Sequence, residues 1–167
     1  MKLVIIRHGP AGDREDWEAE GRDDRLRPLT AKGKKEVRGA AKGLAALVPA
    51  LDLLATSPLT RAVETADIVA AEYGCEIELL ELLTPESRPD QLMPWLEQQR
   101  EDGTVGMVGH EPHLSSLSAY LLTGRPKSFM ELKKGGAYLL ELADPPRPGD
   151  ATLHWLLTGD ALRRLND

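Results

Sequence analysis

The stretch VIIRHGPAG, residues 4–12, begins as an unbroken apolar run and passes directly into Arg7, His8 and Gly9. A continuous run of aliphatic residues is typical of a central strand that is covered on both faces. We expect this strand to end where the charged residues begin. Arg7 and His8 are then either solvated residues at the end of a strand or side chains that the strand delivers to a reaction site.

Strands and helices alternate along the rest of the chain. Apolar runs predict strands at residues 2–7, 53–57, 76–80, 104–110, 136–142 and 151–157. Apolar residues at helical spacing predict helices at residues 30–48, 57–73, 89–100 and 113–122. This alternation indicates a three-layer α/β/α sandwich with a mostly parallel sheet. The short connection between the last two strands predicts an antiparallel hairpin at one edge.

Several residues predict where the helices begin and end. Thr30 is a suitable N-cap for the first helix, and Ser57 followed by Pro58 predicts the start of the second as N-cap and first turn. Gly74 is expected to close that second helix. Residues 10–28 are polar and without period, so we expect a loop over one end of the sheet, with the acidic run at 15–24 as a solvated lid.

Length and composition restrict the classes of protein to consider. The 167 residues fit one domain, expected to cover 1–167, and the net charge of −6 argues against a broad nucleic-acid or membrane-binding face. Cys75 is the only cysteine, so an intrachain disulfide is excluded. The first strand follows Met1 directly, with an apolar run too short for a signal peptide, and we expect a cytoplasmic protein.

Three motifs follow three of the predicted strands. Arg-His-Gly at 7–9 follows the first, Ser-Pro-Leu-Thr-Arg at 57–61 the second, and Gly-His-Glu at 109–111 the fourth. In an open α/β sheet, ligands bind beyond the carboxyl ends of the strands, so Arg7, His8, Arg61 and His110 are expected together. Two guanidinium groups beside two imidazoles favour an anion, and the fork of arginine suits a tetrahedral oxyanion. This set of residues predicts a phosphate site.

The motifs resemble those of the histidine phosphatase (phosphoglycerate mutase-like) superfamily, and most of all its compact SixA-type phosphohistidine phosphatases. Their order and spacing match from residue 2 to about residue 157. The matching residues are Arg7-His8-Gly9, Arg27-Pro28-Leu29-Thr30 with Gly33, Ser57-Pro58-Leu59-Thr60-Arg61-Ala62 with Glu64-Thr65, and Gly109-His110.

The resemblance implies a mechanism and a set of roles. His8 would attack phosphorus and form a phosphohistidine intermediate, which water then hydrolyses. Arg7, Arg61 and His110 would hold the phosphoryl oxygens, and no metal or other cofactor is required. Glu86 lies in the stretch where many members carry the acid that protonates the leaving group, although no clear motif marks it. It is either that acid or a solvated loop residue.

The expected function is hydrolysis of phosphohistidine on a phosphoprotein, because a protonated imidazole leaves without a strong general acid. The short chain also leaves little material to enclose a small ligand. A small-molecule phosphomonoesterase and a non-catalytic phosphopeptide-binding module remain as alternatives. His110 and His113 could form a metal pair, although the sequence offers no third ligand in a recognisable pattern. The oligomeric state is not predicted.

Overall fold

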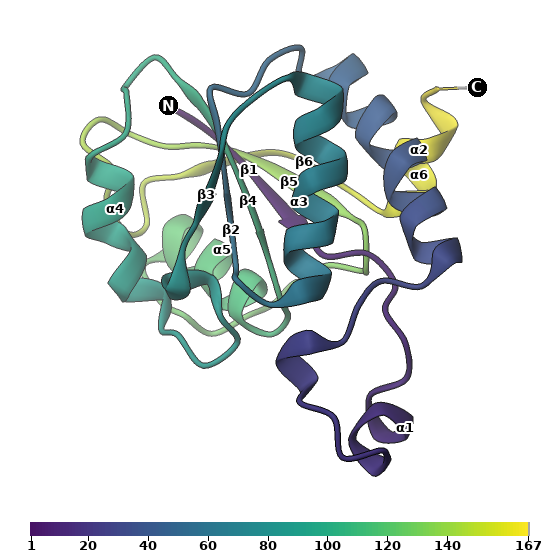
Figure 1. The fold of residues 1–167 in the computed structure, drawn as a ribbon. Helices are drawn as coiled ribbons and strands as arrows, with labels where there is room; N and C mark the ends of the chain where they lie inside the picture. Colours follow the sequence, from purple (N-terminus) through teal and green to yellow (C-terminus); the bar gives the residue numbers. More distant parts are fainter. Residues whose placement is uncertain (167) are drawn as a thin grey trace.

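The structure of the chain is a computed structural model that describes residues 1–166. Its centre is one six-stranded sheet in the order β3-β2-β4-β1-β5-β6 (Figure 1). The strands β1 to β4 run parallel, whereas β5 is antiparallel to β1 and β6 is antiparallel to β5. The bounds are β1 (Lys2–Arg7), β2 (Leu53–Thr56), β3 (Ile77–Leu79), β4 (Thr104–Gly109), β5 (Ala137–Glu141) and β6 (Thr152–Leu157). The predicted parallel sheet with an antiparallel edge is confirmed.

Two hydrophobic cores lie on the two faces of the sheet, because side chains along a strand alternate between faces. In β1, Val4 and Ile6 belong to one core, and Leu3 and Ile5 belong to the other. All four side chains are buried. The predicted three layers are therefore present, with β1 covered on both sides.

Helices supply the outer layers (Figure 1). The first core includes residues of α2 (Ala31–Leu47), α3 (Thr60–Tyr73) and α6 (Gly159–Arg164). The second core includes residues of α4 (Met93–Glu97) and α5 (His113–Thr123). Among residues 1–166, no helix combines the length and the apolar character that crossing a bilayer requires.

The register of the strands brings their carboxyl ends to one edge. Arg7 pairs with Gly109 across β1 and β4, and Thr56 pairs with Val108 across β2 and β4. The next residues along the chain, His8, Ser57 and His110, therefore leave the sheet side by side. The three motifs of the sequence start from this edge.

The segment 10–28 contains helical structure where a loop was expected. It holds α1 (Arg14–Ala19) and the 3-10 helix η1 (Asp24–Leu26). The side chain of Asp13 accepts a hydrogen bond from the Asp16 amide, and that of Asp23 accepts one from the Arg25 amide. Local capping thus orders a polar segment that has no apolar period. We call residues 11–29 the lobe; it projects from the body of the molecule beneath α2 and α3 in Figure 1.

The predicted start of α3 was wrong by about three residues. The helix begins at Thr60 after an extended Leu59, which provides no side-chain cap. Ser57, predicted as the N-cap, instead places its hydroxyl 2.8 Å from the His110 ring and accepts the Leu59 amide at 3.3 Å. The end of α3 is as predicted, with Gly74 in the left-handed region at φ 67°.

Two other helix predictions need correction. Residues 89–100 form a 3-10 helix, η3 (Pro89–Leu92), followed by the short α4, rather than one helix. Pro94 has no N–H and starts a new helix instead of continuing the first. The C-terminal helix α6 was not predicted; Thr158 caps it by accepting the Ala161 amide. A further 3-10 helix, η2 (Glu81–Leu83), follows β3. Leu47, an apolar residue within the predicted helix at 30–48, is exposed rather than packed in the core.

Candidate active site

The structure places all five predicted site residues around one cavity of about 750 Å³. Arg7 ends β1 and His8 follows it, whereas His110 follows β4. Arg61 stands in the first turn of α3, and Glu86 lies in the loop after η2. The cavity therefore draws on the carboxyl ends of two central strands and on the first turn of the helix that follows β2.

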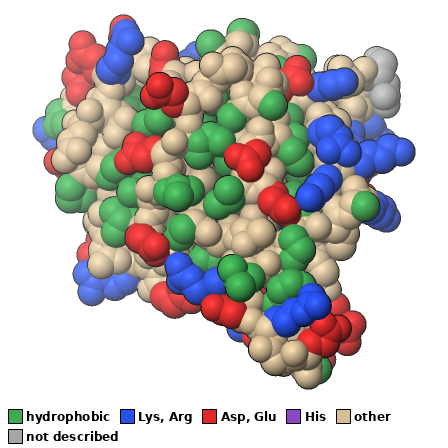
Figure 2. Space-filling view, in the orientation of Figure 1, with side chains coloured by type: hydrophobic (Ala, Val, Ile, Leu, Met, Phe, Trp, Pro, Cys, Tyr) green, Lys and Arg blue, Asp and Glu red, His purple; other side chains and the backbone are tan. Residues whose placement is uncertain are grey.

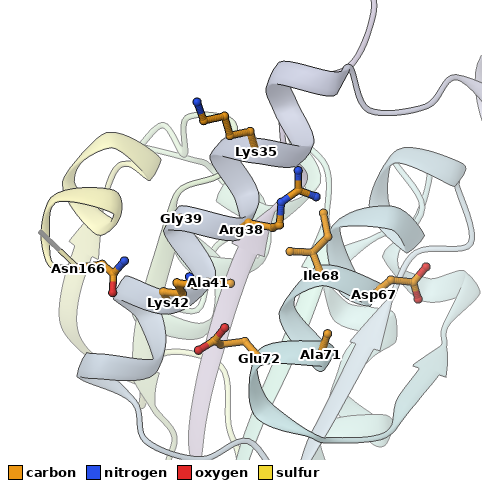
Figure 3. A pocket seen from close by; sticks show the side chains of 10 residues that line it. All are labelled: Lys35, Arg38, Gly39, Ala41, Lys42, Asp67, Ile68, Ala71, Glu72 and Asn166. Atoms are coloured by element: carbon orange, nitrogen blue, oxygen red, sulfur yellow. The ribbon is translucent and has the colours of Figure 1, made fainter.

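A second cavity, of about 570 Å³, lies between α2 and α3 (Figure 3). Its α2 wall carries exposed Lys35, Arg38 and Lys42, and its α3 wall carries exposed Asp67 and Glu72. Figure 2 shows basic side chains gathered on the side of the molecule where α2 and α6 lie. The charges lining this groove are solvated, and its ten lining residues include neither histidine nor cysteine. We therefore assign the candidate active site to the cavity at the carboxyl ends of the strands.

His8 is held with one ring nitrogen fixed. Its Nδ1 lies 2.8 Å from the carbonyl oxygen of Gly9, which accepts the Nδ1 proton and leaves the lone pair on Nε2. Burial, opposed by this hydrogen bond and assisted by the charges of Arg61 and Arg7, lowers the pKa of His8 to about 3. The ring is therefore neutral near pH 7, and Nε2 is available as a nucleophile.

The backbone beside His8 is fixed to α3. The Gly9 amide donates to Thr65 Oγ1 at 3.1 Å, and the same hydroxyl donates to the Arg61 carbonyl at 2.7 Å. A Cβ at position 9 would overlap the Val37 side chain, so only glycine allows this approach to α2. Glu64, the acidic residue of the same motif as Arg61 and Thr65, accepts the Leu29 amide at 2.7 Å. Gly9, Glu64 and Thr65, which all belong to the motifs that match the family, thus connect the backbone segments around His8.

His110 packs beside His8, with a distance of 5.0 Å between ring centroids. Its Nε2 lies 2.8 Å from Ser57 Oγ, and its Nδ1 is buried with no partner among the described residues. Burial, together with the neighbouring His8 and Arg61, lowers the pKa of His110 to about 2. The second imidazole is therefore also neutral near pH 7, which removes the repulsion that two imidazolium groups would exert.

Arg61 is buried and Arg7 is half-buried, and both are held through their terminal nitrogens. Arg7 Nη1 donates to the Leu132 carbonyl at 2.8 Å, and Arg61 Nη1 donates to the Asp24 carbonyl at 2.9 Å. The Nε of each arginine is buried without a partner among residues 1–166. Burial lowers the pKa of both guanidinium groups, but arginine stays protonated at any ordinary pH. Two positive charges, one buried and one half-buried, therefore line one cavity.

Sequence reasoning missed several polar residues that line this cavity. They include Asp24, Glu111 and Lys134. Glu111 accepts hydrogen bonds from the amide and hydroxyl of Ser115 and from the Leu132 amide at 3.4 Å. The Leu132 carbonyl accepts a hydrogen bond from Arg7. Glu111 therefore positions Arg7 indirectly, because it binds the amide of the same residue. The position of Glu111 directly after His110 was the available signal.

Glu86 stands apart from the other four predicted residues. It is exposed and lies at the rim of the cavity beside Pro85. Among the described residues, no hydrogen bond or ion pair holds its carboxylate. The structure thus places Glu86 within the site but does not fix its orientation.

The histidines do not form a metal cluster within the described part of the chain, where no group of three or more His, Cys, Asp or Glu side chains could hold an ion. His113 is buried, does not line the cavity, and has no partner among residues 1–166 for either ring nitrogen. His154 is an exposed strand residue paired with Glu141 at 2.7 Å. A metal pair of His110 and His113 thus lacks a third ligand in the described residues.

Comparison with known structures identifies the fold. The protein histidine phosphatase SixA, in a complex with tungstate, superimposes with a TM-score of 0.82 over 97% of this chain and 99% of its own, at 24% identity. A phosphoserine phosphatase variant from Entamoeba histolytica, bound to phosphoserine, gives a TM-score of 0.70 over 96% and 98% of the two chains, at 19% identity. The predicted phosphoglycerate mutase-like fold is confirmed.

Sequence comparison gives the family. An uncharacterized protein from Picosynechococcus sp. is 34% identical over 139 residues, which cover 81% of this chain and 82% of that protein. The family model described as the histidine phosphatase superfamily (branch 1) matches residues 3–84, a range that holds the Arg-His-Gly motif and Arg61. The predicted resemblance is confirmed, and the chain belongs to the histidine phosphatase superfamily.

Proposed function

We propose that this phosphatase hydrolyses phosphohistidine on a phosphoprotein through a covalent intermediate on His8. The observation that carries the proposal is the His8 ring. It is neutral, its Nδ1 proton is held on Gly9, and it lies in a cavity lined by the guanidinium groups of Arg7 and Arg61. A pocket that only binds phosphopeptides has no need of a nucleophile prepared in this way.

In the first step, His8 Nε2 forms a bond to phosphorus while the bond from phosphorus to the substrate nitrogen breaks. The imidazole of the substrate leaves with a proton. In the second step, water attacks the phosphorus of the intermediate, inorganic phosphate is released, and His8 returns to its neutral form. In this proposal Arg7, Arg61 and an N–H of His110, which line the cavity, stabilise the negative charge on the phosphoryl oxygens.

Two observations support phosphohistidine as the substrate: the loose position of Glu86, the candidate general acid, and the open cavity. Glu86 is the only one of the predicted residues left without a fixing contact in the described chain, which suits a substrate whose leaving group needs little help. The cavity is bordered by the lobe and stays open to solvent, so a side chain on a folded protein can enter it. The likeness to SixA supports this class.

A small-molecule phosphomonoesterase is the second candidate, and the likeness to a phosphoserine phosphatase favours it. The two are separated by comparing turnover of a phosphohistidine peptide, a phosphosugar and p-nitrophenyl phosphate. The proposal expects the highest kcat/KM for the peptide. A preference for the phosphosugar would contradict the proposal and favour a small-molecule phosphomonoesterase. If none of the three substrates were turned over, the protein would be a phosphopeptide-binding module.

The same assay includes EDTA, because the proposed chemistry uses protein groups alone. Turnover of the peptide should be unchanged after incubation with the chelator and gel filtration. Loss of activity that zinc restores would return His110 and His113 to consideration as metal ligands. The expected cytoplasmic location stays a prediction.

A further inference from the structure

We propose that Asp24 is a positioning residue that holds Arg61 in the orientation required to bind the phosphoryl group. The inference rests on the proposed function, since it assigns Arg61 to the phosphoryl oxygens. Asp24 belongs to η1 in the lobe, 37 positions before Arg61 in the sequence. No motif of the sequence includes it.

Asp24 binds Arg61 through two different groups. Its backbone carbonyl accepts from Arg61 Nη1 at 2.9 Å, and its carboxylate Oδ2 accepts from Arg61 Nη2 at 3.2 Å. These contacts occupy the end of the guanidinium fork. They leave Nε, which is buried and has no partner among the described residues. One residue thus fixes the plane of the guanidinium. Each terminal nitrogen carries two protons, so one proton of each is left for an oxyanion.

The same carboxylate holds a second buried arginine. Its Oδ1 accepts from Arg27 Nε at 2.8 Å, and Arg27 Nη1 donates to the Gly12 carbonyl. The side chains of Arg61 and Arg27 are only 6% and 9% exposed, whereas that of Asp24 is 19% exposed. A buried guanidinium without a carboxylate partner is costly, so Asp24 offsets the burial of both.

Asp24 is ionised in this setting. Burial by itself raises the pKa of Asp24, but the hydrogen bond from Arg27 and the charges of Arg61 and Arg27 outweigh it and lower the pKa below its usual range. Asp24 also connects the lobe to the body. Two further polar contacts join the lobe to the body: the Leu29 amide donates to Glu64, and Arg25 pairs with Glu81 at 3.6 Å.

The Asp24 carboxylate bound to Arg61 could play either of two roles. A holder fixes the guanidinium and improves phosphate binding, whereas a competitor occupies the guanidinium and must be displaced by phosphate. The contacts to Asp24 use one proton of each terminal nitrogen of Arg61 and leave the other, which favours the holder. The two roles predict changes of opposite sign when Asp24 is removed.

The test is a double-mutant cycle on Asp24→Ala and Arg61→Ala, with inorganic phosphate as the probe in calorimetry and p-nitrophenyl phosphate as the substrate. Asp24→Ala alone should weaken phosphate binding and lower kcat, each by about tenfold. In the Arg61→Ala background, the same change should have an effect of about twofold or less, since Asp24 acts through Arg61. Additive losses in the two backgrounds would contradict the proposal.

Controls separate this role from a loss of charge or of structure. Asp16→Ala removes an exposed carboxylate from the same lobe and should change phosphate affinity by less than about twofold. Asp24→Asn keeps an oxygen for Arg61 Nη2 and should restore most of the affinity; the cycle uses this variant if Asp24→Ala does not fold. Tighter phosphate binding in Asp24→Ala would overturn the proposal in favour of a competitor. Because phosphate affinity is measured without turnover, a parent protein with no phosphatase activity would contradict the proposed function alone.

Discussion

The neutral His8 ring gives the first prediction at the scale of single residues. His8→Ala should lower turnover of the phosphohistidine peptide by about a thousandfold or more, because no other group can form the covalent intermediate. Phosphate binding should persist within about tenfold, since Arg7 and Arg61 keep their own partners, Leu132 and Asp24. Steady-state kinetics and calorimetry on the same preparation check both parts. Equal turnover in His8→Ala and the parent would remove the covalent mechanism.

Glu86 gives the second prediction. If it is the general acid, Glu86→Gln should slow phosphomonoesters strongly, because an alkoxide cannot leave unprotonated, and barely change phosphohistidine. Kinetics of the one variant on both substrates decide the role. Loss on both substrates would indicate a binding role, and no change on either would make Glu86 a solvated loop residue.

The contacts of single residues show which members of the candidate site could be predicted from the sequence. Arg7, His8, Arg61 and His110 were predictable because each lies at or just beyond a strand or helix end whose place in the sheet follows from the chain order. Asp24 was not, because its bond to Arg61 depends on the path of the lobe, and that path is set by side-chain caps rather than by an apolar period.

At the scale of elements, the first turn of α2 packs against the backbone that follows His8. A Cβ at Gly33 would overlap the Pro10 carbonyl, which is backbone and cannot move aside. Gly33→Ala should therefore lower the free energy of unfolding by about 1–3 kcal/mol and reduce turnover by displacing the segment beside His8. Urea unfolding and steady-state kinetics measure the two effects.

The matched control is in the same helix. A Cβ at Gly39 meets only the Arg163 side chain, at 3.0 Å, and that flexible chain can shift. Gly39→Ala should leave stability unchanged or raise it by up to about 1 kcal/mol, because alanine favours a helix interior. If both variants lost the same stability, the contact between Gly33 and Pro10 would not be the cause.

The elements themselves were largely predictable from apolar runs. All six strands were predicted from their apolar runs. Buried side chains lie in β1, β2, β4 and β5, whereas β3 and β6, the strands at the two edges of the sheet, contain none. The errors fall where side chains serve the site or where elements are short. The start of α3 was misplaced because Ser57 bonds to His110, and α6 was missed because six residues give too short a pattern.

At the scale of the whole molecule, three buried histidines predict how stability depends on pH. Burial lowers the pKa of His8, His110 and His113, the first two to about 3 and about 2. Below about pH 6.5 the unfolded chain takes up protons that the folded protein does not, so stability should fall by up to roughly 1.4 kcal/mol per pH unit for each histidine. Urea unfolding at pH 7.5 and 5.5 measures the slope.

His113→Leu isolates one of these three contributions. Neither ring nitrogen of His113 has a partner among residues 1–166, so a leucine of similar size leaves no polar group unpaired. The variant should lose about one histidine's share of the pH dependence and unfold less readily at pH 5.5. An unchanged slope would mean that His113 is protonated equally in the folded and unfolded states.

The central place of β1 also has a consequence for synthesis of the protein. The ribosome makes residues 2–7 first, yet the two neighbours of β1 in the sheet are β4 and β5, at residues 104–109 and 137–141. A nascent chain that ends before β5 already contains both histidines and both arginines of the site. It lacks the antiparallel neighbour of β1, and the Leu132 carbonyl that fixes Arg7 has only just been made. Translation therefore delivers the nucleophile well before β5, and a growing chain should stay inactive until β5 has left the exit tunnel.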